Sequence, residues 1–147
     1  MLRILVVDDE IGIIELIKRL IDPEIPAEVI GEASDGKRAY ELILRFKPDI
    51  VITDIRMPGL NGVELVQKAR QEGLSCEFIL VSGYRDFNYA RDAIRYGVLD
   101  YLLKPINREE LNQLIAGVYE KQKNSNHMRE RLAIAEPQLC TDAHPHL

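Results

Sequence analysis

The sequence has little of what marks secreted, membrane-inserted or nucleic-acid-binding chains. It holds only two cysteines in 147 residues, Cys76 and Cys140, and their wide separation argues against a structural disulfide. The formal net charge is -5, so the basic excess of a nucleic-acid-binding surface is missing. The apolar run after Arg3 is short and stops at two aspartates, which predicts neither a signal peptide nor a membrane span and favours a cytoplasmic location.

What the sequence does have is enough apolar material for one α/β domain. Hydrophobic residues make up 46% of the chain and charged residues 29%, which suits a full core but leaves little room for a second domain. Apolar runs alternate with helical patterns, and this alternation predicts a parallel sheet. The expected strands are residues 3–7, about 28–33, 50–52, about 77–82 and 100–103.

Five helices are expected to follow these strands. The first stops near Asp22, the second is capped by Ser34 or Asp35, and the fifth is capped by Asn107. The third and fourth are expected over residues 63–72 and 86–96. The sequence therefore predicts five strand–helix units in one domain.

Polar side chains stand where four of the expected strands end: Asp8-Asp9, Asp54, Ser82 and Lys104-Pro105. The carboxyl ends of parallel strands meet at one edge of the sheet, which is the usual binding crevice of such folds. Three carboxylates, a hydroxyl and an ammonium group are therefore expected to meet there. Each alone is ordinary in a turn or a helix cap, and their coincidence at four strand ends favours a functional site.

This set of groups suits a divalent cation and phosphoryl transfer. A hard cation such as Mg²⁺ prefers oxygen ligands, which makes Asp9 and Asp54 candidate direct ligands and Asp8 a direct or water-mediated one. The backbone carbonyl of Arg56 is a further candidate ligand. Without a cation the carboxylates repel one another, and at least one of their pKa values is expected to rise.

Phosphoryl transfer also needs a nucleophile and groups that neutralise the charge on the phosphoryl oxygens. Asp54 can provide the attacking oxygen. Lys104 offers a positive charge, and Ser82 offers a hydroxyl donor.

Taken together, these residues make the chain resemble the receiver domain of two-component response regulators. The resemblance covers about residues 2–119, in order and without gaps. It is carried by the segments Ile4-Leu-Val-Val-Asp-Asp-Glu10, Pro48-Asp-Ile-Val-Ile-Thr-Asp-Ile-Arg-Met-Pro-Gly59, Asn61-Gly62, Ser82-Gly83 and Asp100-Tyr-Leu-Leu-Lys-Pro-Ile106.

The resemblance implies a doubly wound, flavodoxin-like five-stranded sheet in the order 2-1-3-4-5. It implies that Asp54 accepts a phosphoryl group from a sensor histidine kinase while Asp8 and Asp9 hold Mg²⁺. Such a protein is a phosphoacceptor with self-catalysed transfer and autodephosphorylation, and not an enzyme that acts on an external substrate.

The same resemblance implies how the signal leaves the site. Lys104 is expected to contact the phosphoryl oxygens. The Lys104–Pro105 peptide bond is expected to be cis, which turns the Lys104 amine toward Asp54. Ser82 and Tyr101 are expected to form the conformational switch, with phosphorylation-dependent homodimerisation as its outcome.

A finer resemblance concerns residues 82–105, which are similar to receivers of AraC-type, helix-turn-helix transcriptional regulators. Residues 1–120 are expected to form the receiver, and residues 121–147 a linker helix and a disordered tail. DNA binding then belongs to a C-terminal domain that this chain lacks. The alternative is a stand-alone receiver that acts through protein contacts.

Two other classes remain as alternatives. A magnesium-dependent aspartyl phosphohydrolase would carry an Asp-x-Asp pattern that begins with its nucleophile. Here Arg56 stands where the second Asp of that pattern belongs. A flavodoxin-like cofactor-binding module needs a phosphate-cradling loop after the first strand, where Asp8 and Asp9 repel a phosphate.

Overall fold

Five parallel strands form the sheet that the sequence predicted, in the predicted order 2-1-3-4-5. The computed structural model describes residues 1–83, 91 and 93–135. The strands are β1 (Leu2–Val7), β2 (Ala27–Ala33), β3 (Ile50–Asp54), β4 (Glu77–Ser82) and β5 (Asp100–Leu103). The predicted fold class is therefore confirmed, and the last two strands have the predicted bounds.

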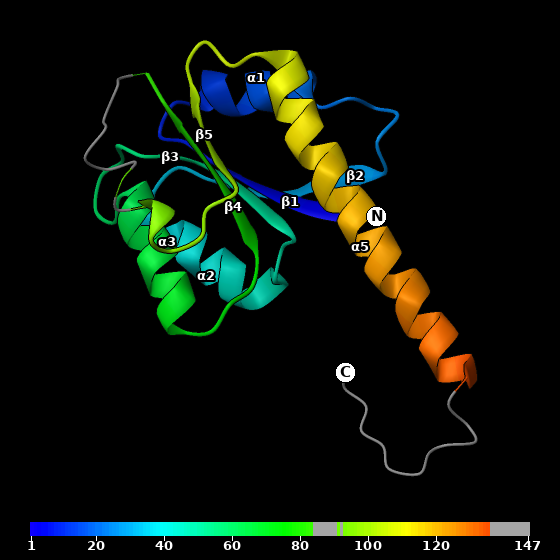
Figure 1. The fold of residues 1–147 in the computed structure, drawn as a ribbon. Coiled ribbons are helices and arrows are strands. Elements are labelled where there is room, and N and C mark those ends of the chain that lie inside the picture. Colours follow the sequence, from blue (N-terminus) through cyan, green and yellow to red (C-terminus); the bar gives the residue numbers. More distant parts are fainter. Residues whose placement is uncertain (84–90, 92, 136–147) are drawn as a thin grey trace.

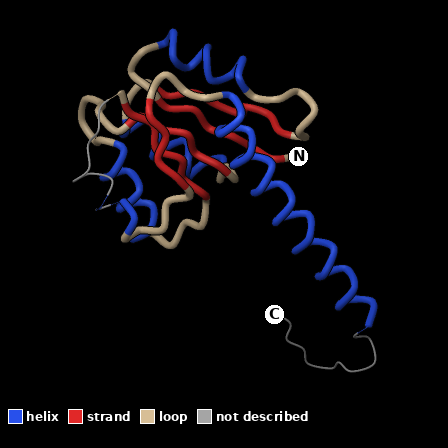
Figure 2. Tube along the Cα trace, turned by 45° about the horizontal axis from the view of Figure 1, so that its top comes forward, coloured by secondary structure: helices blue, strands red, loops and turns tan. Residues whose placement is uncertain are grey.

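Helices cover both faces of the sheet. They are α1 (Ile11–Leu20), α2 (Gly36–Phe46), α3 (Gly62–Gln71) and α5 (Arg108–Ala135). Figure 1 shows α1 and α5 on one face and α2 and α3 on the other. Turned by 45°, the molecule shows the second half of α5 projecting away from the sheet (Figure 2).

Side-chain caps fix two of the helix starts. The Asp35 side chain accepts a hydrogen bond from the Arg38 backbone N–H at 2.8 Å, which settles the choice between Ser34 and Asp35. The Asn107 side chain accepts from the Glu110 backbone N–H at 3.0 Å, as predicted. Each cap satisfies a backbone donor that the first turn of a helix leaves unpaired.

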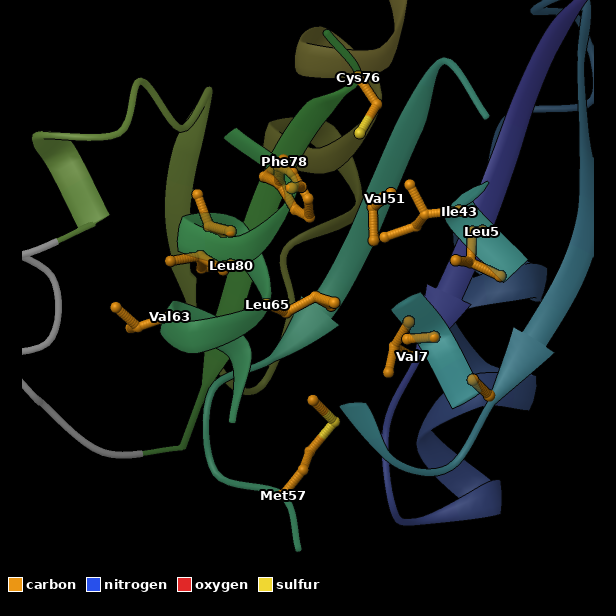
Figure 3. Close-up of a cluster of buried hydrophobic side chains, with 14 of the residues drawn as sticks. Leu5, Val7, Ile43, Val51, Met57, Val63, Leu65, Cys76, Phe78 and Leu80 are labelled. Atoms are coloured by element: carbon orange, nitrogen blue, oxygen red, sulfur yellow. The ribbon is translucent and has the colours of Figure 1, made fainter. Parts of the chain in front are cut away.

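The sheet is buried on both faces, because its three inner strands are apolar along most of their length. Alternate residues point to opposite sides. One set joins the core beneath α2 and α3, called here the α2/α3 cluster: Leu5, Val7, Val51, Phe78 and Leu80, with Leu65 and Met57 (Figure 3). The other set joins the core beneath α1 and α5: Ile4, Val6, Ile50, Ile52, Ile79 and Val81, with Leu111 and Ile115.

Two predictions concern segments near the limits of the described residues. Most of the predicted fourth helix, residues 86–96, lies outside them, although Ala93 and Ile94 are helical. Cys140 also lies outside them, whereas Cys76 is a buried free thiol just before β4. Among the described residues, no helix is long and apolar enough to cross a membrane.

Candidate functional site

The carboxyl edge of the sheet brings four sequence-predicted residues together. Asp8 follows β1, Asp54 ends β3, Ser82 ends β4 and Lys104 follows β5. The parallel register aligns these ends, since Asp54 pairs with Val81 across the β3–β4 ladder. Asp8, Asp54 and Ser82 are all buried, although each is polar. Buried polar groups gathered at one strand edge mark this place as a site.

The Lys104 ammonium bridges the two buried carboxylates. Its Nζ donates to Asp8 Oδ2 at 3.1 Å and lies 3.6 Å from Asp54 Oδ2. The Lys104 side chain is only 18% exposed, so water screens its charge only in part. The predicted carboxylate–ammonium group is therefore present in the fold.

The site is electrostatically unbalanced. Burial, together with the negative charge of Asp8, raises the pKa of Asp54 from its ordinary value of 3.8 to about 6. Burial also raises the pKa of Asp8. The expected rise is therefore present, but removal from water is its first cause and carboxylate repulsion its second.

Lys104 responds in the opposite sense. Burial acts to lower the pKa of this ammonium group, but the hydrogen bond to Asp8 and the charge of Asp54 outweigh burial and raise it. Lys104 is thus held in its charged form. A fixed cation beside Asp54 is what an incoming anion requires.

Three carboxylates around β1 can hold a cation. One oxygen from each of Asp8, Asp9 and Glu10 lies within 4.8 Å of the others. Hard oxygen donors, one of them buried, fit Mg²⁺. The sequence analysis missed Glu10, although its place in the acidic run Asp8-Asp9-Glu10 was a usable signal. Asp54 lies outside this group of three, next to the Lys104 ammonium.

The loop after β3 fixes the orientation of Asp54. Asp54 Oδ1 accepts a hydrogen bond from its neighbour, the Ile55 backbone N–H, at 2.9 Å. The Ile55 carbonyl in turn accepts from the Gly62 N–H at 2.8 Å, so the loop closes on itself. Arg56 lies between them with an exposed side chain, while its neighbours Ile55 and Met57 are buried. The loop therefore leaves Asp54 with Oδ2 free to face Lys104.

The two predicted switch residues lie on neighbouring strands. Ser82 is buried at the end of β4, and Tyr101 of β5 is half-buried against the α2/α3 cluster. The Lys104 backbone N–H donates to the Ser82 carbonyl at 2.8 Å, which ties the two strand ends together. The Lys104–Pro105 bond is cis, as predicted.

The fold and this edge of the sheet define a class of protein. Residues 4–116 match the family model described as the response regulator receiver domain. The chain therefore belongs to the response regulator receiver family, and the predicted resemblance is confirmed. Receiver domains are phosphoacceptors of two-component systems.

Individual relatives agree with this membership. The chain is 37% identical over 140 residues to the uncharacterized transcriptional regulatory protein YesN of Bacillus subtilis, covering 95% of this chain and 38% of that protein. It is 40% identical over 116 residues to the transcriptional regulatory protein HptR of Staphylococcus aureus, covering 78% of this chain and 45% of HptR. This chain thus spans less than half the length of these relatives.

A solved structure shows the same architecture. The receiver domain of AraT, a response regulator from Geobacillus stearothermophilus, superposes with a TM-score of 0.78 at 40% identity. The match covers 85% of this chain and 98% of that domain.

Proposed function

We propose that Asp54 accepts a phosphoryl group from a sensor histidine kinase, with Mg²⁺ bound beside it. The observation that carries this proposal is the Lys104 ammonium held between the buried Asp8 and Asp54 carboxylates at 3.1 and 3.6 Å. Membership of the receiver family supports the same assignment. A buried carboxylate next to a fixed cation is the arrangement that a phosphoryl acceptor needs.

The reaction is an in-line exchange of one bond for another. An Asp54 carboxylate oxygen forms a bond to phosphorus while the bond from phosphorus to the kinase histidine nitrogen breaks. The bonding electrons return to that nitrogen. Lys104 and the Ser82 hydroxyl donate hydrogen bonds to the phosphoryl oxygens and stabilise their charge.

Mg²⁺ held by Asp8, Asp9, Asp54 and the Arg56 carbonyl supplies charge neutralisation when it is bound. These ligands remain a proposal, supported by the oxygen donors around β1. Glu10 joins them as a residue that can bind the ion directly or through water.

Intact-mass measurement with a small phosphodonor tests the assignment. We expect the wild-type protein to gain the mass of one phosphoryl group with Mg²⁺ and none with a chelator. Asp54→Asn should gain none, whereas Asp100→Asn, which changes an exposed carboxylate at the opposite end of a strand, should behave as the wild type. Equal labelling of wild type and Asp54→Asn rejects Asp54 as the acceptor.

The proposed output is control of transcription through a domain beyond this chain. Residues 1–120 form the receiver in this proposal, and residues 121–147 a linker helix and tail. Support comes from relatives named as transcriptional regulators and more than twice as long as the matched region. The similarity of residues 82–105 to AraC-type receivers favours a helix-turn-helix output over a stand-alone receiver.

The proposed switch couples Asp54 to the surface of β5 and α5. The Ser82 hydroxyl moves toward the phosphoryl oxygens, Tyr101 turns inward, and the altered face associates with a second copy. Sedimentation with and without a beryllofluoride phosphoryl mimic tests this. We expect a dimer with the mimic only, and equal association in both conditions rejects the switch.

A further inference from the structure

Gly36, the first residue of α2, touches the backbone of the loop that follows Asp54. A Cβ added to Gly36 would lie 2.0 Å from the Leu60 carbonyl oxygen and 2.6 Å from the Leu60 Cβ. A carbon–oxygen contact needs at least about 3.3 Å. Any larger residue at position 36 therefore forces the loop backbone to retreat by about 1 Å.

Backbone freedom does not explain this glycine. Gly36 lies within a regular helical turn and has no positive φ, unlike Gly59, Gly73 and Gly97. It is also buried. The space that a Cβ would fill is taken by the Leu60 carbonyl, so close approach is the reason that only glycine fits.

The loop that Gly36 touches joins Asp54 to α3. Its far end is held by Gly62, where an added Cβ would lie 2.4 Å from the Asp54 carbonyl oxygen. Its middle is anchored by Met57, which is buried in the α2/α3 cluster with Val7 (Figure 3). Gly36 thus adds a contact from a separate element. It begins α2, which follows β2, the edge strand two places away from β3 in the sheet.

We propose that Gly36 is a positioning residue for the metal and phosphoryl site. It lets α2 hold the loop after β3 at the place where the Arg56 carbonyl can serve as a ligand beside Asp54. The inference rests on the proposed function, because it needs Mg²⁺ to bind at this loop. Groups that position metal ligands typically account for about 10- to 100-fold in metal affinity.

The chain offers a matched control glycine. Gly117 lies inside α5, and a Cβ there would meet nothing within 4 Å. Gly117→Ala therefore makes the same chemical change in a helix without a clash. It is not part of the proposed site.

Magnesium binding, measured by calorimetry with MgCl₂ and no phosphodonor, tests the proposal on the whole chain. For Gly36→Ala we expect the dissociation constant to rise by about tenfold or more, with Gly117→Ala unchanged. Phosphorylation of Gly36→Ala should then recover at high Mg²⁺, so that its half-saturating Mg²⁺ concentration rises more than its maximal rate falls. A folded Gly36→Ala variant with wild-type magnesium affinity overturns the proposal, even if its melting temperature is lower.

A second measurement serves if Gly36→Ala does not fold. In a magnesium titration of the wild-type protein followed by amide NMR, the Gly36 and Leu60 signals should shift together with that of Ile55, beside Asp54. The Gly117 signal should stay in place. Stationary Gly36 and Leu60 signals overturn the proposal, while a wild-type protein that binds no Mg²⁺ rejects the proposed function itself.

Discussion

The two ends of the sheet treat carboxylate charge in opposite ways. At the carboxyl edge, Asp8 and Asp54 share one ammonium group, and the pKa values of both carboxyls are raised. At the amino edge, both oxygens of Asp49 are matched: Oδ2 accepts from the Arg3 backbone N–H at 2.8 Å and Oδ1 from the Gln122 side chain at 2.9 Å. The carboxyl edge therefore gathers two mutually repelling carboxylates around one cation, whereas the single Asp49 carboxylate at the amino edge has an uncharged donor for each oxygen.

Arg70 shows the same contrast for a cation. Its guanidinium donates to the carbonyls of Leu74, Cys76 and Tyr96 at 2.8–2.9 Å and lies 5.3 Å from the centre of the Phe78 ring. Lys104 instead faces two carboxylates that repel each other. The amino edge is built for stability, and the carboxyl edge keeps an imbalance that a cation and a phosphoryl group can relieve.

The largest loss of stability is expected from Arg70→Met. The carbonyls of the α3–β4 loop and of the turn before β5 lose their shared donor, so we expect the free energy of unfolding to fall by about 3–4 kcal/mol. Urea unfolding of the metal-free protein measures it. Arg70→Lys should recover only part, because one ammonium cannot reach all three carbonyls, and a loss under about 1 kcal/mol contradicts the claim for this edge.

At the carboxyl edge the sign should reverse, since Asp54→Asn removes a destabilising charge. The folded-state pKa of Asp54 is about 6. Because this pKa is above the unfolded value, the protonated Asp54 carboxyl contributes its full stability below about pH 4. That contribution is lost as the pH rises through about 6. At pH 7 without metal we expect the variant to be more stable by about 2–3 kcal/mol.

The pH dependence sharpens that expectation. The gain from Asp54→Asn should vanish near pH 4, where wild-type Asp54 is protonated. Asp100→Asn, which changes an exposed carboxylate at the start of β5, serves as the control. A pH-independent difference would mean that Asp54 is not the group that titrates.

Lys104→Met should have a smaller effect that magnesium partly reverses. Removal of the ammonium leaves Asp8 and Asp54 without their shared partner, and about 1–2 kcal/mol of stability should be lost in the metal-free protein. Saturating Mg²⁺ should reduce the difference because the ion supplies positive charge at the same edge. Thermal unfolding with and without MgCl₂ gives the comparison, and an unchanged difference would show that the ion binds elsewhere.

Much of this molecule could be predicted from the sequence, because local signals are strong. Apolar runs that end in Asp8, Asp54 and Ser82 predicted both the strands and the edge where they meet. The Asn107 cap was equally local. Contacts between distant backbone segments have no such signal: nothing in the residue types shows that Leu60 lies against Gly36. Nor could the sequence show that burial outweighs repulsion at Asp54, since burial depends on the packed fold.

The end of the receiver, expected near residue 120, stays a prediction. The linker beyond it was expected to be helical, and α5 runs unbroken to Ala135. Gln122 lies past that boundary and still contacts the domain, through Asp49. The first turn of the expected linker is therefore hydrogen-bonded to Asp49, the residue before β3.

The smallest expected effect tests that contact. Gln122→Ala removes one exposed hydrogen bond, so global stability should fall by only about 0.5–1 kcal/mol. Amide exchange should report it more clearly: residues 120–125 of α5 should exchange faster, because the helix loses its hydrogen bond to Asp49, the residue before β3. Lys123→Ala changes an exposed neighbour and should leave exchange as it is. If both variants exchange alike, the linker is independent of the amino edge from residue 120 onward, and the matched carboxylate at that edge serves the sheet alone.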